Sequence, residues 1–167
     1  MSEIKSLSIK MIAMDVDGTL TNGMIYIGEN GEIMKAFNVK DGYAISDMMS
    51  EHGIIPMIIT GRKSKIVENR ARELGVELVY QGVKDKLELI KKLAEENDVT
   101  LKEVAYIGDD INDLDCIKAC GYSGCPQDAV DEVRACADYT STKNGGAGAV
   151  SEFIQQVINL GGVGKRC

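Results

Sequence analysis

The chain has 167 residues, 44% of them hydrophobic, which is enough for one domain with its own core. Its formal net charge of -7 argues against nucleic acid or an anionic membrane as the main partner. No apolar run is long enough to span a membrane and the N-terminal segment lacks a signal-peptide core, so we expect a cytoplasmic protein.

The five cysteines are odd in number and form no C-x-x-C pair. This usage predicts reduced thiols rather than a disulfide framework. Cys116, Cys120 and Cys125 are close in sequence, but no fourth ligand follows at a spacing that suits a structural zinc site.

Short apolar runs alternate with amphipathic segments, a pattern typical of a parallel sheet covered by helices. The expected strands are Ile9–Asp15, Ile54–Thr60, Glu77–Tyr80, Val104–Asp109, Tyr122–Cys125 and a short one around Tyr139. The expected helices are Lys40–Glu51, Lys63–Leu74, Lys84–Glu96, Asn112–Ala119, Ala129–Cys136 and Gly148–Leu160. We therefore predict an α/β fold with a three-layer, Rossmann-like parallel sheet in a single domain over residues 1–160, followed by a flexible glycine-rich tail over 161–167.

One segment interrupts this alternation. Residues 23–37 contain two strand-like arms around Asn30-Gly31, a strong signal for a β-hairpin. Because an isolated two-stranded hairpin is marginally stable in water, we expect it to pack against something else. Another subunit is the candidate.

Asp15 and Asp17 follow the first apolar strand, and Gly18 and Thr19 come directly after them. In an open α/β sheet ligands bind outside the carboxyl ends of the strands, which would place both acids at the mouth of a site. Two close carboxylates repel each other unless a cation compensates them, and oxygen ligands suit Mg²⁺. Taken alone, such a pair is more often a helix-capping acid with an exposed neighbour.

Further polar residues follow or precede the other expected elements. Thr60 and Gly61 end the second strand of the sheet, and Lys86 lies near the start of a helix. The fourth strand of the sheet ends in three acids, Asp109, Asp110 and Asp113, and one carboxamide, Asn112. Three acids at a buried sheet edge require a cation, so these groups together predict a metal-dependent site.

The four motifs, in this order, resemble those of the haloacid dehalogenase superfamily, specifically its phosphatases. The resemblance implies that Asp15 is the nucleophile that forms an aspartyl-phosphate and that Asp17 is the general acid and base. It implies Asp15, Asp17 (through its carbonyl) and Asp109 as ligands of Mg²⁺. The remaining implied roles are phosphoryl binding by Thr60, Gly61 and Lys86, and support of the metal site by Asp110, Asn112 and Asp113.

The chain also resembles one family without a cap domain, the 3-deoxy-D-manno-octulosonate 8-phosphate phosphatases and their sialic-acid-pathway relatives. The resemblance includes the hairpin, Phe37–Gly42, Thr60-Gly61-Arg62 and Gly145–Ala149. It implies a sugar-acid phosphate as substrate, Arg62 and Arg70 on the sugar-acid side, and a homotetramer with hairpins at its centre. The elements expected between Thr19 and Lys86 leave no room for a cap, so a neighbouring subunit is the expected cover of the site.

Two departures from that family affect the substrate. Ser151 and Ala147 stand where the family usually has basic residues. A nine-carbon keto-acid 9-phosphate is therefore an alternative substrate. A non-catalytic module that tetramerises a CMP-sugar-acid synthetase is a second alternative, although Asp15, Asp17 and Lys86 are all present. A signalling receiver domain is disfavoured because the strand ending at Tyr80 supplies no acid.

Overall fold

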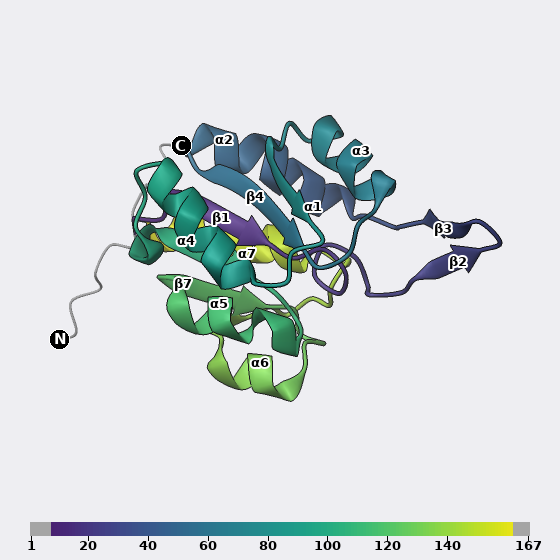
Figure 1. Ribbon diagram of the computed structural model, residues 1–167. Coiled ribbons are helices and arrows are strands. Elements are labelled where there is room, and N and C mark those ends of the chain that lie inside the picture. Colours follow the sequence, from purple (N-terminus) through teal and green to yellow (C-terminus); the bar gives the residue numbers. More distant parts are fainter. Residues whose placement is uncertain (1–7, 162–167) are drawn as a thin grey trace.

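Six parallel strands form a single sheet in the computed structural model, which describes residues 8–161. The sheet order is β5-β4-β1-β6-β7-β8, so β1 lies at its centre (Figure 1). The strands are β1 Met11–Met14, β4 Ile55–Thr60, β5 Leu78–Gln81, β6 Val104–Ile107, β7 Tyr122–Cys125 and β8 Tyr139–Thr140. After β1, the chain adds β4 and β5 on one side of β1, and then crosses to the other side, where it adds β6, β7 and β8. The predicted parallel α/β sheet is confirmed.

Side chains of β1 alternate between two buried cores. Ile12 and Met14 belong to the core on one face of the sheet, and Met11 and Ala13 belong to the core on the other. This alternation follows from the two-residue period of a strand, with both faces covered.

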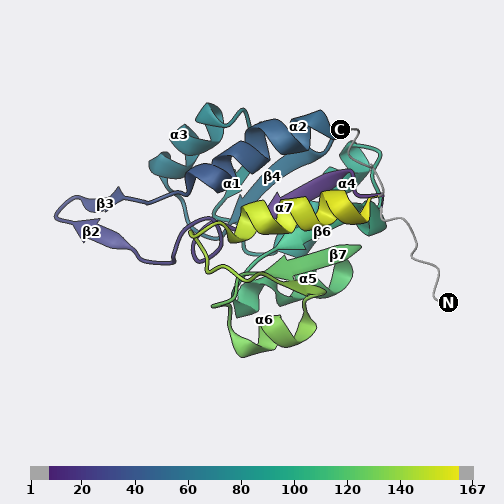
Figure 2. The ribbon, with the colours of Figure 1, turned by 180° about the vertical axis from the view of Figure 1, so that it is seen from behind.

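Helices form the two outer layers. One face is covered by α1 Val39–Tyr43, α2 Met49–Glu51, α3 Lys65–Glu73 and α7 Ala149–Leu160. The other face is covered by α4 Lys86–Glu96, α5 Leu114–Ala119 and α6 Asp131–Cys136. Figure 1 shows α4 and α5 in front of the sheet, and Figure 2 shows α7 across its opposite face. The three predicted layers are confirmed.

Helix boundaries differ from the predictions by one to two residues, for local reasons. The helix predicted from Lys84 begins at Lys86 because Asp85 is its N-cap, and the Asp85 side chain accepts a hydrogen bond of 2.9 Å from the backbone N–H of Glu88. The predicted helix over 40–51 is one continuous helical segment whose middle, Ala44–Met48, is a π-helix. Two short 3-10 helices, Leu101–Glu103 and Ile111–Asp113, precede β6 and α5.

The hairpin forms a separate two-stranded sheet of β2 Tyr26–Gly28 and β3 Gly31–Met34, which extends away from the body of the domain (Figure 1). Its turn residues are Glu29 and Asn30, one position earlier than predicted. Gly31 opens β3 with a φ of 107°, a conformation that favours glycine.

Apolar side chains on the hairpin are exposed. Met24, Ile27 and Ile33 each expose about three-fifths of their surface, at 59%, 63% and 62%. Such a surface on a two-stranded sheet is unusual for a segment that has no further contact partner.

Within residues 8–161 no cap domain is inserted between the sheet elements. The hairpin and the helical segment 39–51 fill the connection from β1 to β4, and α3 and β5 fill the connection from Thr60 to Lys86. None of the helices between residues 8 and 161 has the length and apolar character needed to cross a membrane. The four cysteines described, Cys116, Cys120, Cys125 and Cys136, form no disulfide with one another. Most of the predicted tail, residues 162–167, lies outside the described residues.

Candidate active site

The register of the sheet brings the predicted motifs together at one edge. Met14, the last residue of β1, pairs with Ile58 of β4 on one side and with Ile107 of β6 on the other. Since all these strands are parallel, the residues that follow them lie at the same carboxyl edge. Asp15, Thr60 and Asp109 therefore meet there, beside the point where the chain crosses from one half of the sheet to the other.

Lys86 reaches this edge from the first residue of α4. Its ammonium nitrogen lies 2.8 Å from Asp15 Oδ1 and 2.7 Å from Asp113 Oδ1, and the lysine side chain is only 2% exposed. Burial alone would lower the pKa of Lys86, but the charges of Asp15 and Asp113 outweigh burial and raise the pKa. The lysine is therefore a fixed positive charge beside two carboxylates.

Asp113 is fully buried and all of its acceptor positions are used. Its Oδ1 atom accepts from Lys86 and from the hydroxyl of Tyr106, and its Oδ2 atom accepts the backbone N–H groups of Asp109 and Asp110 at 2.9 and 3.1 Å. Gly108 allows this close packing, because a Cβ there would lie 2.4 Å from Asp113 Cγ. Asp113 thus holds both Lys86 and the loop that carries Asp109.

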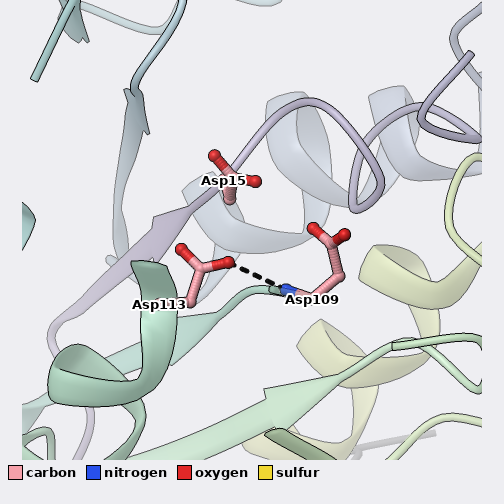
Figure 3. Close-up of side chains that lie close together, drawn as sticks. All are labelled: Asp15, Asp109 and Asp113. Carbon is pink, nitrogen blue, oxygen red and sulfur yellow. Dashed lines mark hydrogen bonds between the residues drawn. The ribbon is translucent and has the colours of Figure 1, made fainter. Parts of the chain in front are cut away.

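Asp109 faces Asp15 across the gap between the ends of β1 and β6. Figure 3 shows the two side chains close together, with Asp113 beside them and hydrogen-bonded to the backbone nitrogen of Asp109. Asp109 Oδ1 accepts a 2.8 Å hydrogen bond from the hydroxyl of Thr19. Gly18, at φ 93°, makes room for this carboxylate, since a Cβ on Gly18 would lie 2.1 Å from Asp109 Oδ2.

These three aspartates fit a divalent cation. Each offers an oxygen within 4.8 Å of the others, and only Lys86 among their described contacts carries a compensating positive charge. Burial and the nearby Asp113 charge raise the pKa of Asp15 to about 6, against the effect of Lys86. Burial, together with the charges of Asp15 and Asp113, raises the pKa of Asp109 to about 8 despite its hydrogen bond from Thr19. Because the oxygens of Asp113 are already engaged, Asp15 and Asp109 are the side chains free to bind the ion.

Asp17 lies at the rim of the site, within a second cluster of charges. Lys35, from the end of the hairpin, donates a hydrogen bond to Asp17 Oδ1 and also lies 2.8 Å from Glu32 Oε1. The Nε atom of Arg62 lies 3.7 Å from Asp17 Oδ2. Asp17 is 17% exposed at its side chain, so it stands between the buried aspartates and solvent.

The other predicted residues divide into two groups. Thr60 is buried at the end of β4, where its hydroxyl accepts a 3.4 Å hydrogen bond from the backbone N–H of Arg62, and Gly61 follows it. Asp110 and Asn112 lie at the exposed start of the 3-10 helix that leads into α5.

Arg70 lies apart from the aspartate cluster. Its NH1 atom lies 2.8 Å from Glu73 Oε2 on the same helix, and its guanidinium carbon lies 5.8 Å from the centre of the Phe37 ring. A Cβ at Gly42 would lie 2.4 Å from Arg70 NH2, so the absence of a side chain there leaves room for the arginine in this position. The structure therefore brings Arg62, but not Arg70, next to Asp17.

Three residues of this edge had no predicted role. Thr19 belongs to the first motif, and its hydroxyl bond to Asp109 joins two segments 90 residues apart. Glu32 and Lys35 lie on the hairpin, where strand and turn residues give no indication of chemistry. The only signal for Glu32 and Lys35 in the sequence is their charge. Since charged residues are common at exposed hairpin positions, this signal does not distinguish site residues from surface residues.

A family model described as haloacid dehalogenase-like hydrolase matches residues 79–154. The 3-deoxy-D-manno-octulosonate 8-phosphate phosphatase KdsC of Escherichia coli K12 is 43% identical over 154 residues, which cover 92% of this chain and 81% of the relative. The KdsC protein of Yersinia pestis is 38% identical over 92% of this chain and 82% of its own length. The chain belongs to the KdsC family of haloacid dehalogenase-like phosphatases.

Solved structures of KdsC phosphatases share the fold. The enzyme of Moraxella catarrhalis, in complex with a magnesium ion, a phosphate ion and a KDO molecule, has a TM-score of 0.89 and 40% identity, with 96% of this chain and 92% of that chain covered. The cobalt-bound form from Haemophilus influenzae has a TM-score of 0.90 and 35% identity, with 95% and 92% covered. The magnesium ion in the Moraxella catarrhalis structure agrees with the group of Asp15, Asp109 and Asp113 in this chain, which could hold such an ion. Mg²⁺ is therefore the cofactor of this phosphatase.

Proposed function

We propose that this phosphatase hydrolyses 3-deoxy-D-manno-octulosonate 8-phosphate, or a sugar-acid phosphate of the same kind, through an aspartyl-phosphate on Asp15. The observation that carries the proposal is the position of Asp15, held by Lys86 and facing Asp109 at the carboxyl edge of the sheet. The substrate class is supported by the names of relatives that are 38–43% identical over 92% of this chain.

The first step is attack on phosphorus by a carboxylate oxygen of Asp15. The new Asp15–phosphorus bond forms as the bond from phosphorus to the ester oxygen breaks, and the ester oxygen takes a proton from Asp17. Lys86 reduces the repulsion between the carboxylate and the phosphate because its ammonium lies 2.8 Å from Asp15 Oδ1.

The second step is hydrolysis of the aspartyl-phosphate. A water molecule gives a proton to Asp17 and attacks phosphorus, and the bond between phosphorus and the Asp15 oxygen breaks. Inorganic phosphate leaves, and both carboxylates return to their starting states. Covalent capture divides a difficult hydrolysis into two easier steps.

Asp15 and Asp109 would hold Mg²⁺ with their side chains, and the resemblance adds the carbonyl of Asp17. The ion, when bound, neutralises charge on the phosphoryl oxygens in both steps. Asp113 supports the site by fixing Lys86 and the backbone of Asp109 and Asp110. Asn112 and Asp110 belong to the same loop.

Thr60, Gly61 and Lys86 are proposed to bind the phosphoryl group, and Arg62 and Arg70 the sugar-acid side. Arg62 is supported by geometry, because its half-exposed side chain lies beside Asp17 at the rim. Arginine also matches a carboxylate in two-pronged fashion. Arg70 is supported by the family resemblance alone, since its guanidinium already contacts Glu73 and Phe37.

A turnover screen with Mg²⁺ tests this function. We expect release of phosphate from 3-deoxy-D-manno-octulosonate 8-phosphate, with nine-carbon keto-acid 9-phosphates and ordinary sugar phosphates as comparison substrates. A preference for a nine-carbon ester would revise the substrate, in keeping with Ser151 and Ala147. Asp15→Asn should abolish turnover of every ester while the protein remains folded, and retained turnover would rule out the proposed nucleophile. A folded wild-type protein that cleaves no ester would instead favour a non-catalytic module.

Arg62→Gln separates the sugar-acid side from the phosphoryl site. It should raise KM for the sugar-acid phosphate about tenfold or more, as expected for a lost charge-assisted contact, and leave KM for p-nitrophenyl phosphate nearly unchanged. An equal rise for both esters would contradict this role.

We also propose that the enzyme is a homo-oligomer, a tetramer by family resemblance, joined through its hairpins. The support is the exposed apolar surface of Met24, Ile27 and Ile33 on a two-stranded sheet that extends from the domain. A neighbouring subunit would then replace the cap domain that residues 8–161 lack.

Two further assignments complete the proposal. We infer that residues 1–160 act as one domain with a tail over 161–167, which limited proteolysis followed by mass spectrometry can test. We infer a cytoplasmic location, supported by the free thiols of the described cysteines, which cell fractionation can test.

A further inference from the structure

Lys35 is buried between two carboxylates, although it belongs to the protruding hairpin. Its side chain is 1% exposed, and its ammonium donates to Asp17 Oδ1 and lies 2.8 Å from Glu32 Oε1. The mechanism above uses Asp17 but gives Lys35 no part.

Glu32 fixes Lys35 from the opposite side and is itself held in place. The hydroxyl of Ser64 donates to Glu32 Oε2, and the backbone N–H of Ser64 donates to Gln81 Oε1 at 2.7 Å. Arg62 NH2 lies 3.8 Å from Glu32 Oε1. Strand β3 is therefore tied through Glu32 to the loop that follows β4, and this loop is tied through Ser64 to the end of β5.

The two oxygens of Asp17 have unequal partners. Oδ1 receives the hydrogen bond from the buried Lys35, whereas Oδ2 faces the half-exposed Arg62 at 3.7 Å. A charge-assisted hydrogen bond to one oxygen fixes the plane and direction of a carboxylate. Proton transfer depends on this direction, because an acid must lie within hydrogen-bond reach of the atom that it protonates.

We propose that Lys35 is a positioning residue that holds Asp17 in the orientation for proton transfer to the leaving oxygen. The proposal rests on the proposed function and deepens it. Lys35 remains protonated throughout. When the bond from phosphorus to the ester oxygen breaks, the proton moves from Asp17 to that oxygen, and the Asp17 carboxylate stays bonded to the lysine. The hairpin thus supplies a positioning group to the site in addition to its exposed surface.

The test compares two esters that differ in their need for an acid. p-Nitrophenolate leaves readily without a proton, whereas the primary alkoxide of 3-deoxy-D-manno-octulosonate 8-phosphate requires one. Lys35→Met should lower kcat/KM for the alkyl ester at least about tenfold more than for p-nitrophenyl phosphate, since general acid catalysis is worth about 10²–10⁴-fold. Asp17→Asn should show the same bias. A merely structural role would slow both esters equally, and that result would overturn the proposal.

The matched control is Lys10→Met. Lys10 pairs with Glu103 at 2.6 Å before the start of β1, at the opposite edge of the sheet, and its side chain is half exposed. The Lys10→Met substitution removes the same charge as Lys35→Met and should leave kcat/KM for both esters unchanged. If wild-type protein cleaves p-nitrophenyl phosphate in an Asp15-dependent way but not the alkyl ester, the proposed substrate fails, and the comparison is repeated with whichever alkyl phosphate the screen identifies.

A double-variant cycle tests whether Lys35 acts through Asp17. In the Asp17→Asn background, adding Lys35→Met should change alkyl-ester turnover less than about twofold, and fully additive losses would contradict the proposal. If Lys35→Met does not fold, Lys35→Arg and Lys35→Gln carry the test. Arginine keeps a charged donor and should retain more alkyl-ester activity than glutamine, whereas equal losses would again overturn the proposal.

Discussion

Asp113 Oδ1 lies 2.7 Å from the ammonium of Lys86, with both side chains almost completely buried. This pair joins the loop after β6 to the start of α4, and Lys86 extends the connection to Asp15 at 2.8 Å. The ammonium of Lys86, which faces Asp15, is thus held in place by Asp113, whose acceptor positions are all occupied.

Asp113→Asn should therefore damage both the fold and the activity. The amide removes the charge that compensates Lys86, and its NH₂ group would face donors in at least one position. We expect the free energy of unfolding to fall by about 2–4 kcal/mol, less than for a fully isolated charge because Asp15 still pairs with Lys86. Urea unfolding and steady-state kinetics measure the two effects. Asp115→Asn, an exposed position on α5, is the control, and equal stability losses in both variants would contradict the assigned role.

Gly18→Ala should weaken Mg²⁺ binding more than it weakens the fold. A Cβ at this position would lie 2.1 Å from Asp109 Oδ2 and displace the carboxylate. Gly53→Ala is a matched control, because Gly53 also has a positive φ, 64°, but no atom within 4 Å of its Cβ position. Both variants should lose about 1 kcal/mol or more from backbone strain. Only Gly18→Ala should raise the Mg²⁺ concentration needed for half-maximal activity, about tenfold or more as expected for the loss of about 1.4 kcal/mol of binding.

Stability should depend on pH in a way that Mg²⁺ alters. Without the ion, the raised pKa values of Asp15, about 6, and Asp109, about 8, mean that the folded protein binds more protons than the unfolded chain above pH 4. Stability of the metal-free protein should therefore fall as pH rises from about 4 to 8.

Mg²⁺ needs these carboxylates ionised, so protons compete with it. We expect saturating Mg²⁺ to raise the melting temperature by about 5 °C or more at pH 8, and by less than half as much at pH 5. Differential scanning fluorimetry with EDTA or Mg²⁺ at both pH values measures this difference. An equal shift at both pH values would show that the ion binds elsewhere.

Charged substitutions on the hairpin should dissociate the oligomer. Ile27→Asp and Ile33→Asp place a carboxylate on the exposed apolar arms, where burial against another subunit would be strongly unfavourable. Sedimentation velocity should show a smaller species than the wild type. Val39→Asp, on a valine at the start of α1 that is even more exposed at 79%, should leave assembly unchanged. A wild-type monomer would refute the proposed assembly outright.

The sequence predicted the sheet and the aspartate cluster because both depend on short patterns. Asp15 directly follows one four-residue strand, and Asp109 follows another after Gly108. Parallel pairing of the two strands brings these ends together without any knowledge of side-chain contacts. Lys86 could be included because its position at a helix start directs it toward the same edge.

The contacts of Lys35 and Arg70 could not be predicted from such patterns. Lys35 contacts both Asp17 and Glu32. Glu32 is in turn held by Ser64, and Ser64 by Gln81, which lie in segments distant in the sequence. Arg70 was grouped with Arg62 by resemblance, but its direction depends on the space left by Gly42, and helix periodicity does not report that space.

The loop before α7 closes the opposite side of the nucleophile segment. A Cβ on Gly145 would lie 1.9 Å from the carbonyl oxygen of Gly18, and the N–H of Gly146 donates to the carbonyl of Thr19 at 3.1 Å. Asp41 then accepts the N–H of Ser151 and fixes the first turn of α7. The segment that follows the nucleophile is therefore supported by a loop that lies far along the chain, so the site is complete only once that loop has docked.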